Sequence, residues 1–571
     1  MLSRAVIAVT ELEKAEMPAT TPSITPDVIV IGSGIGGLTL ASLLTQLQRK
    51  KVLVLERHFQ AGGFTHQFSR GKYHWDVGLH YVGEMEKTSM IRQMFDLVTC
   101  SQVQWARLPE PFERFSYPGF EFNLYGDPQR YAADLIERFP DERAAIHKYF
   151  NDIRRAAQAL TFTTLETNTH GWLRLLMTAG RLWNGRHLAL TTKDYLQAQF
   201  RDPMLRTLLA SQWGDYGLPP AMSAFPVHAT IAHHYRHGAY YPVGGAGGIA
   251  ESVRSIVEKA GGQFLLRREV TEIIIENGRA TGVRVRRSGT RQPLPIEEYR
   301  APVIISDAGA AATYLRLVPQ SQPLPFREDL RRFVQQYPAT SHACLYIGFS
   351  ADPRSIGIGG GNIWIYQHTD HDASFARRAK SLEQGAPEQA YVSFPSLRDP
   401  QATAHTAEII TFADYDQFAR WREEPWLHRD EDYRQFKERI TGGLLRLVES
   451  RLPGFSSLVA QCELSTPVTS EHFTGHFRGA IYGLTGFPDA FNPECRGWTS
   501  VRTPIPGLFL TGVDTTRVAG IVPGMLSGIV TLSALPGGPS FASVFKESRR
   551  RARATKPPSP KPSDSSHSAT A

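Results

Sequence analysis

Residues 27–37 read DVIVIGSGIGG, a short apolar run that leads directly into a glycine-rich turn. The run has the composition of a buried strand, and apolar residues then recur at helical spacing from 38 to 47. A second apolar run, KVLVLE, occupies residues 51–56. The order strand, helix, strand predicts a βαβ unit at the start of the fold.

The turn contains the pattern GxGxxG, formed by Gly32, Gly34 and Gly37. The first glycine permits a tight turn, the second lets the backbone approach a pyrophosphate, and the third lets helix and strand pack closely. Glu56 follows Gly37 by 19 residues, where its carboxylate can accept hydrogen bonds from ribose hydroxyls. The pattern alone has low specificity, but this context predicts a dinucleotide-binding site.

The far end of the chain repeats the order strand, turn, helix and favours FAD over NAD. Residues 507–510 (GLFL) predict a strand, Gly512 and Asp514 a turn, and 523–535 a helix with Pro523 in its first turn. FAD is long, so its flavin end needs a partner far from the first glycine turn. We expect Asp514 to bind a ribityl hydroxyl and the helix N-terminus to stabilise the reduced flavin. The alternative role of Asp514 is to form the turn.

The loop after the second strand also favours FAD. Gly62 and Gly63 follow Glu56 closely, and we expect their loop to lie over the pyrophosphate. The Glu56 carboxylate would repel the additional phosphate of NADP, although the adjacent Arg57 weakens that argument.

Composition excludes several other classes of protein. The chain of 571 residues is 42% hydrophobic and 21% charged, which is ordinary for a globular protein of several domains. It has no apolar run of about 18 residues, and its N-terminal apolar stretch is too short for a secretory signal. The four cysteines are scattered, without zinc spacing. We therefore expect a cytoplasmic, non-secreted protein without a disulfide framework.

The net charge of +8 is concentrated at the C-terminus. Residues 546–571 hold seven basic and two acidic side chains, which account for +5 of it. Nucleic-acid binding needs a basic folded face, so no nucleic-acid partner is predicted. We expect 539–571 to be a disordered basic tail, for which contact with anionic lipid headgroups is the alternative.

Three longer segments resemble one family of FAD-binding proteins, which comprises phytoene desaturases, carotenoid cis–trans isomerases and retinol saturases. The segments are AGGFTHQFSRGKYHWDVGLHYVGEME at 61–86, YGLPPAMSAFPVHATIAHHYRHGAYYPVGG at 216–245 and FRGAIYGL at 477–484. The first contains the run Asp-x-Gly-x-His-Tyr-x-Gly of the retinol saturase branch, here Asp76, Gly78, His80, Tyr81 and Gly83. These segments are far more specific than the glycine turn.

The resemblance implies an α/β fold. It predicts a Rossmann-type, amine-oxidase-like (GR2) FAD-binding domain assembled from non-contiguous segments, beside an α+β substrate domain. It covers about Asp27 to Leu535 and implies that the Val270 backbone meets the adenine. The residues expected at FAD are Gly32, Gly34, Ile35, Gly36, Gly37, Glu56, Arg57, Gly62, Gly63, Val270, Gly512, Asp514, Val522 and Pro523.

The alternation of elements along the chain suggests the domain boundaries. We expect a flexible tail at 1–26, and the basic tail described above at the other end. The FAD-binding domain is expected at 27–109, 235–319 and 491–538, and the substrate domain at 110–234 and 320–490.

The chain departs from the family at three places. Phe64-Thr65 stand where animal saturases tend to have cysteines, and residues 517–523 differ from the C-terminal motif. We also expect no N-terminal signal segment of the kind those proteins have. These departures bear mainly on the identity of the substrate.

The family's chemistry brings a flavin against a C=C bond of a lipophilic retinoid or polyisoprenoid. Saturation needs a hydride for one carbon and a proton for the other, so a proton donor is expected near the substrate. His80 and Tyr81 are the leading candidates and Tyr482 is a third, with a structural role as the alternative for each.

Neither a metal site nor a second nucleotide site is predicted. His233, His234 and His237 lack an evident acidic or cysteine partner nearby in the sequence. The glycine-rich stretch 244–248 lacks a matching downstream acid, so the electron donor stays unidentified.

Residues 171–190 predict an amphipathic helix. One face would carry Trp172, Leu175, Leu176, Ala179 and Trp183, and the opposite face Arg174, Thr178 and Arg181. Such a helix either lies in a membrane interface or packs its apolar face on the substrate domain, and we favour the second arrangement.

The sequence therefore favours a retinol-saturase-like reductase. A carotenoid isomerase or a phytoene-type desaturase on the same fold is the first alternative. An amine-oxidase-like flavoenzyme and a non-catalytic, flavin-bearing lipid carrier are more distant ones.

Overall fold

Segments from the two ends and the middle of the chain build one parallel sheet. The computed structural model describes residues 24–169, 171–185, 187–289, 295–337, 339–484 and 486–554. The sheet has the order β19-β13-β1-β2-β9, with β1 at Val28–Ile31, β2 at Val52–Leu55, β9 at Gln263–Leu265, β13 at Val303–Ser306 and β19 at Leu508–Leu510. Strand β13 thus joins the first strand of the fold to the last.

Helices cover this sheet and bury its strands. The helices α2 (Ile35–Gln48) and α18 (Ile521–Ala534) pack against each other, and α10 (Gly247–Lys259) packs on α2. Both β1 and β2 are apolar throughout and buried throughout, as strands of a covered parallel sheet must be. The predicted βαβ unit and the Rossmann-type fold are therefore confirmed.

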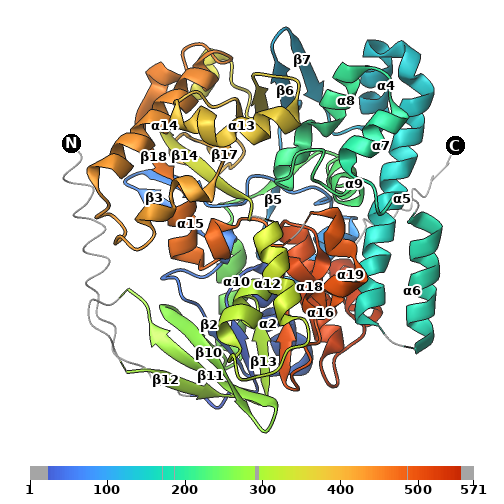
Figure 1. Cartoon of the computed structure of the whole chain (residues 1–571), viewed down its shortest axis with the longest axis vertical. Coiled ribbons are helices and arrows are strands. Elements are labelled where there is room, and N and C mark those ends of the chain that lie inside the picture. Colours follow the sequence, from blue (N-terminus) through green and yellow to red (C-terminus); the bar gives the residue numbers. More distant parts are fainter. Residues whose placement is uncertain are drawn as a thin grey trace, which may run out of the picture.

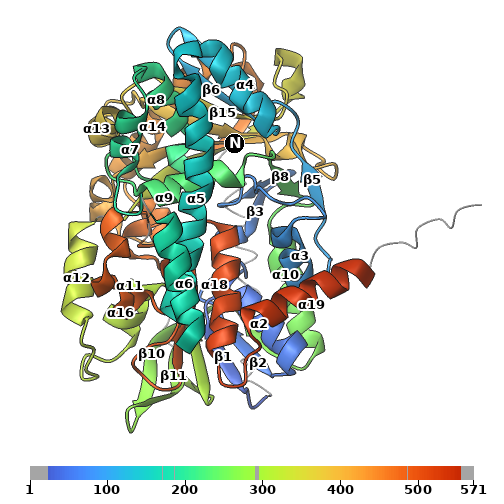
Figure 2. The same cartoon turned by 90° about the vertical axis from the view of Figure 1, so that its right-hand side faces the viewer.

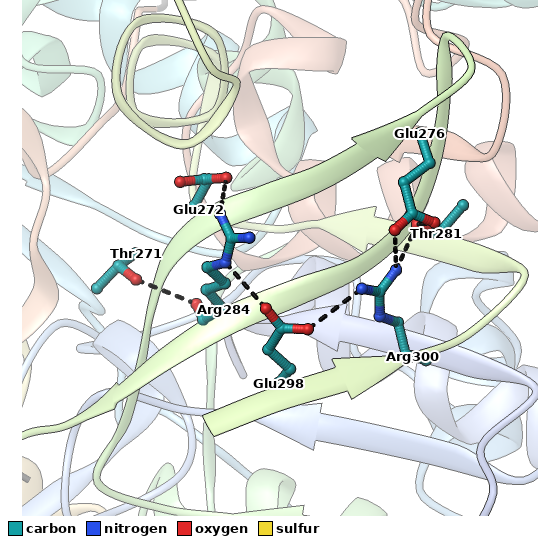
Figure 3. A network of polar contacts seen from close by, with 7 residues as sticks. All are labelled: Thr271, Glu272, Glu276, Thr281, Arg284, Glu298 and Arg300. Atoms are coloured by element: carbon teal, nitrogen blue, oxygen red, sulfur yellow. Dashed lines mark hydrogen bonds and ion pairs between the residues drawn. The ribbon is translucent and has the colours of Figure 1, made fainter. Parts of the chain in front are cut away.

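A three-stranded antiparallel sheet extends from this domain. It consists of β10 (Arg268–Glu276), β11 (Arg279–Arg287) and β12 (Glu297–Arg300). Its outer face carries a chain of ion pairs (Figure 3), in which Glu298 accepts from both Arg284 Nε, at 3.0 Å, and Arg300 Nη2, at 3.2 Å. These side chains are about half exposed, so the pairs contribute little stability.

A seven-stranded mixed sheet forms the other half of the molecule (Figure 1). Its order is β18-β14-β17-β16-β15-β6-β7, and only β15 and β6 pair in parallel. The strands are β6 (Glu113–Tyr117), β7 (Phe120–Leu124), β14 (Ser341–Phe349), β15 (Asn362–Tyr366), β16 (Gln389–Ser393), β17 (Thr406–Ala413) and β18 (Val459–Ser465). The sheet therefore combines strands from both segments assigned to the substrate domain.

The two faces of this sheet have different roles. The helices α13 (His371–Glu383) and α14 (Glu431–Glu449) cover one face, against a core that includes Ile365, Val392 and Ile409. The neighbouring residues Trp364, Tyr391 and Ile410 point to the opposite face, which lines a cavity. The period-2 alternation of a strand thus separates core from cavity.

The apolar face of helix α6 (Gly171–Asn184) does not pack on the substrate domain. Trp172 is 70% exposed, Leu175 71% and Trp183 84%. The helix packs on α5 (Arg143–Asn168) through another face, where the Arg181 Nε–Glu166 Oε2 distance is 2.6 Å. The arrangement favoured from the sequence was wrong. The side of α6 that faces α5 carries Arg181 and Gly180, where a Cβ would lie 3.0 Å from the Phe162 ring, and the apolar face therefore points outward.

Part of the predicted disordered tail is a helix. Residues Phe541–Ala554 form α19, which packs on α3 (Met90–Val98) with Val544 and Ser548 buried. The basic composition concealed an apolar stripe at helical spacing, and Glu547 pairs with Arg550 and Arg551. Residues 1–23 and 555–571 of the two predicted tails lie outside the described residues. Within the described part, no helix has the length and apolarity to cross a membrane.

Candidate functional site

The glycine turn between β1 and α2 has the geometry of a cradle for an anion. Gly32 has a φ of +91°, which residues with a side chain rarely adopt. A Cβ on Gly34 would lie 2.6 Å from Asp307 Oδ2, and a Cβ on Gly37 would lie 2.6 Å from the Gly32 carbonyl oxygen. Because α2 begins at once, without a side-chain cap, its first N–H groups remain available to a phosphate.

Glu56 ties the loops around this turn together. Its Oε2 accepts hydrogen bonds from Ser33 N (2.9 Å) and Ser33 Oγ (2.7 Å), and its Oε1 accepts from His58 N (2.8 Å). Ser33 Oγ also accepts from Gly62 N at 2.9 Å, and a Cβ on Gly63 would lie 3.1 Å from Gly34 Cα. The loop with Gly62 and Gly63 therefore covers the glycine turn.

The two ends of the chain meet at this turn. A Cβ on Gly36 would lie 2.9 Å from Gly512 N, and a Cβ on Gly528 would lie 2.8 Å from the Gly36 carbonyl oxygen. Asp514 accepts from Ala310 N and Leu484 N, both at 2.7 Å. The aspartate thus fastens three distant segments and also borders the cavity, so its turn-forming role and a role at a ligand are compatible.

Asp307 is a carboxyl group at this site that the sequence did not point to. It directly follows β13, and its buried carboxyl group lies against the backbone N–H groups of Gly34 and Gly37. Burial, to which the carboxylates of Glu56 and Asp514 add, raises the pKa of Asp307 to about 7. The signal that could have found it is its place at the carboxyl end of a parallel strand beside β1.

One cavity of about 300 Å³ connects the glycine turn to an aromatic chamber in the other half of the molecule. At the turn it is bordered by Ile35, Glu56, Arg57 and Val270. The chamber is lined by aromatic side chains from the seven-stranded sheet and its neighbours, namely Trp213, Trp364, Tyr366, Tyr391, Phe412 and Tyr482. A long ligand with a polar, anionic end and an apolar neighbour would fit this shape.

Most residues expected at the cofactor border this cavity, and three do not. Gly37 packs α2 against β1, as its Cβ distance shows. Val522 is buried in the core, and Pro523 is likewise absent from the lining. Their neighbours Gly520, Ile521 and Gly524 form this wall instead, because α18 begins at Ile521 and turns Val522 away from the cavity.

His80 borders the chamber and pairs with a buried carboxylate. Its Nδ1 lies 2.6 Å from Glu408 Oε2, and Glu408 is fully buried on β17. The Arg398 guanidinium donates to the His80 carbonyl at 2.8 Å. Next to this pair, burial and the proximity of His80 lower the pKa of His342 to about 4.

Tyr81 lies behind the chamber wall. Its hydroxyl is 2.6 Å from Glu113 Oε1 and 2.7 Å from Asp215 Oδ2, and its ring stacks on Tyr235. Burial raises the pKa of Tyr81 well above its usual range. Of this group only Asp215 borders the cavity, and no sequence pattern indicated that Asp215 or Glu113 would meet Tyr81.

Tyr482 and Asp76 each form hydrogen bonds that connect separate segments of the protein. The Tyr482 hydroxyl donates to the Gly214 carbonyl at 2.8 Å while its ring borders the cavity. Asp76 accepts hydrogen bonds from Tyr241 and from Ala246 N, and burial raises its pKa to about 7. Asp76 therefore fastens β4 (Tyr73–Asp76) to the segment before α10.

The histidine cluster of His233, His234 and His237 contacts the acidic side chain of Glu84 through His234. His234 Nδ1 lies 2.9 Å from Glu84 Oε2, and His234 Nε2 accepts from Gly83 N at 2.9 Å. Across the described residues, no group of three or more histidine, cysteine or acidic side chains is arranged to hold a metal ion. The four cysteines are free.

The residues around the glycine turn fit a dinucleotide. The uncapped start of α2 suits the pyrophosphate, the glycines leave the space that a Cβ would fill, and Glu56 offers an oxygen to a ribose. The model of the NAD(P)-binding Rossmann-like domain matches residues 30–97, which contain this turn and Glu56.

Curated proteins resemble the chain over most of its length. An all-trans-retinol 13,14-reductase of Danio rerio is 32% identical, over 89% of this chain and 85% of its own. A Danio rerio relative named as an inactive all-trans-retinol 13,14-reductase is 27% identical, over 86% and 82%. The chloroplastic prolycopene isomerase of Arabidopsis thaliana is 24% identical, over 88% and 81%.

A solved structure has the same fold. Cyclohexylamine oxidase from Brevibacterium oxydans matches 93% of this chain and 99% of its own, with a TM-score of 0.56 and 14% identity. This likeness shows an amine-oxidase-like fold and carries no information on the substrate.

Proposed function

We propose, since this chain belongs to the family of all-trans-retinol 13,14-reductases and prolycopene isomerases, that it is an FAD-dependent oxidoreductase acting on a conjugated C=C bond of a retinoid, carotenoid or related polyisoprenoid. We favour reduction of the double bond. The observation that carries the proposal is the single cavity that connects a dinucleotide cradle with a buried aromatic chamber. A polyisoprenoid is apolar and elongated, and such a chamber suits it.

We propose partners in this chain for four parts of FAD. We assign the pyrophosphate to the start of α2 under the loop of Gly62 and Gly63, and the adenosine ribose to Glu56. We assign the adenine to the Val270 backbone and the ribityl chain to Asp514. Reduced FAD, when bound, supplies a hydride for one carbon of the double bond. The buried chamber excludes water and holds the apolar substrate beside the flavin end of the cavity.

Product mass tests the proposal. Purified protein loaded with FAD and reduced anaerobically is incubated with all-trans-retinol or with a poly-cis carotene, and the lipids are analysed by mass spectrometry. A gain of two hydrogens supports the reductase. Unchanged mass with altered double-bond geometry supports the isomerase, which the similarity to prolycopene isomerases makes the second candidate. Protein that stays colourless after incubation with FAD would refute both.

The same preparation tests the distant alternatives. An amine oxidase would produce peroxide and bleach the flavin on addition of a primary amine, and we expect neither. The relative named as inactive suggests a second alternative, a carrier without activity. Such a carrier would bind retinol without reoxidising the flavin.

We also propose a lipid partner for the exposed side of helix α6. On a helical wheel the exposed residues Trp172, Leu175, Leu176, Ala179, Leu182 and Trp183 fall within one third of the circumference. Helix α19 lies on the same side of the molecule (Figure 2) and exposes four cations, namely Lys546, Arg549, Arg550 and Arg553. An apolar face beside exposed cations suits the interface of an anionic membrane, in which a polyisoprenoid substrate would dissolve.

A further inference from the structure

Tyr81, Glu113 and Asp215 form a hydrogen-bonded group at the chamber wall in which two carboxyl groups share one tyrosine hydroxyl. The Tyr81 hydroxyl lies within hydrogen-bond distance of two carboxyl groups, Glu113 at 2.6 Å and Asp215 at 2.7 Å. A tyrosine hydroxyl has one hydrogen, so it donates to one of these oxygens and must accept from the other. One of the two carboxyl groups therefore carries a proton.

The surrounding contacts identify Asp215 as the protonated group. Glu113 also accepts from Gln212 Nε2 at 2.7 Å and from Trp364 Nε1 at 3.1 Å, so three donors surround its charge. Asp215 has Tyr81 as its hydrogen-bond partner among the described residues. The order of donation is thus Asp215 to Tyr81 and Tyr81 to Glu113. Burial, and then the charge of Glu113, raises the pKa of Asp215 well above its usual range.

The position of Asp215 gives this proton access to a ligand. Asp215 ends the short helix Ser211–Asp215 and borders the cavity, whereas Tyr81 and Glu113 do not. The aromatic rings of Trp364, Tyr391 and Tyr482 line the same chamber. A conjugated chain lying among these rings would be within reach of the Asp215 carboxyl group.

We infer that Asp215 is the proton donor in the reduction, with Tyr81 and Glu113 as positioning residues. This inference rests on the proposed function. As the C=C π bond breaks, one carbon gains a C–H bond with the hydride of reduced FAD. Its neighbour gains a C–H bond with the proton of Asp215, whose O–H bond breaks as the carboxyl group gives up its hydrogen bond to Tyr81 and turns to the substrate. Asp215 is left as a carboxylate, and water returns the proton after the product leaves. The flavin is oxidised by two electrons and the substrate is reduced by two.

Two readouts on the full-length, FAD-loaded protein test the assignment. The first is a single anaerobic turnover of all-trans-retinol in D2O. The two measured quantities are the rate of flavin reoxidation and the deuterium content of the product. The second needs no substrate: the infrared C=O stretch of a protonated carboxyl group is compared in wild type and variant. The variants are Asp215→Asn, Asp215→Glu and Glu113→Gln, and the exposed helix cap Asp127→Asn serves as control.

The inference makes distinct predictions for each variant. Asp215→Asn should retain FAD, lose the protonated-carboxyl infrared band that persists above pH 8, where Asp76 and Asp307 are mostly ionised, and slow reoxidation by about 10²- to 10⁴-fold, the usual contribution of a general acid. Asp215→Glu should restore part of the rate. Glu113→Gln removes the charge that raises the pKa of Asp215, so the rate should decline at a lower pH than in wild type. Asp127→Asn should resemble wild type, whose product should carry two deuteriums, because the N5–H of reduced flavin and the carboxyl proton both exchange with D2O.

Other outcomes overturn the inference. An unchanged infrared band in Asp215→Asn, or reoxidation within a few-fold of wild type, would refute Asp215 as the donor. Loss of the rate in His80→Gln while Asp215→Asn remains active would assign the role to His80 instead. A wild-type protein that shows the band but never reduces a double bond would refute the proposed function, and the proton of Asp215 would then be structural.

Discussion

The buried carboxyl group of Asp307 makes the stability of the FAD-free protein depend on pH. Its pKa is raised from 3.8 to about 7, first by burial and then by the charges of Glu56 and Asp514. In the unfolded chain the group ionises near pH 4, but in the folded chain it holds its proton to about pH 7. Folding therefore loses stability as the pH rises from about 4 to about 7, and the loss then levels off.

Asp307→Asn should remove this penalty, because an amide does not titrate and retains an acceptor oxygen beside the glycine turn. A pKa rise from 3.8 to about 7 corresponds to a penalty on the order of 4 kcal/mol on the ionised form. Relative to wild type, the variant should therefore gain up to this amount of unfolding free energy between pH 4 and pH 8. The pKa values of Asp76 and Glu113 are also raised, but these groups are present in both proteins. The difference in unfolding free energy between wild type and variant therefore isolates Asp307.

Denaturant unfolding of FAD-free wild type and variant at several pH values measures this difference, with Asp127→Asn as an exposed control. FAD titration at the same pH values provides a second measurement, because an ionised Asp307 would repel the cofactor's phosphates. Affinity should decline with pH in wild type and decline less in the variant. A stability difference that is constant from pH 4 to pH 8 would refute the reasoning.

Three further predictions test other parts of the structure. Gly36→Ala places a Cβ 2.7 Å from Asp307 Oδ1 and 2.9 Å from Gly512 N, so flavin absorbance after purification should fall at least about tenfold. Gly359→Ala, at an exposed glycine with open space around it and no positive φ, should retain the cofactor. Trp172→Ala combined with Trp183→Ala should release the protein from anionic liposomes in a flotation assay, and equal flotation of wild type and variant would exclude α6 as the contact. Arg284→Gln breaks the exposed ion pairs that this arginine makes in Figure 3. The unfolding free energy should decrease by only about 0.2–1 kcal/mol, and a larger decrease would show that the ion pairs stabilise the fold.

The sequence predicted the dinucleotide half of the fold well because its signals are local. A tight turn needs glycine at Gly32, and a buried parallel strand needs an unbroken apolar run such as VLVL in β2. The far end could be joined to this turn because FAD is longer than one βαβ unit. The details of that end were harder: Pro523 marks the first turn of α18, but which residues of that turn face the cavity depends on the rotation of the helix.

Helix orientation explains the two errors in the surface elements as well. The pattern of α6 correctly separates an apolar face from a polar one, but only the Arg181–Glu166 pair and the neighbouring helix decide which face turns inward. In α19 the cations dominate the composition, and less conspicuous residues at helical spacing hold the helix on α3. Amphipathicity therefore defines two faces, and tertiary contacts assign them.

The chemistry of the chamber depends on contacts that no local pattern records. His80 and Tyr81 are adjacent in the sequence, yet His80 faces the cavity beside Glu408, more than 300 residues away, while Tyr81 faces Glu113 and Asp215 behind the wall. Adjacent residues on an extended segment point in opposite directions, so only one of such a pair can border a ligand. The acidic groups come from a strand end and a short helix that carry no recognisable signature. Only the folded structure places two carboxyl groups at the single hydrogen of the Tyr81 hydroxyl, and this contact is the basis of the proposed role of Asp215.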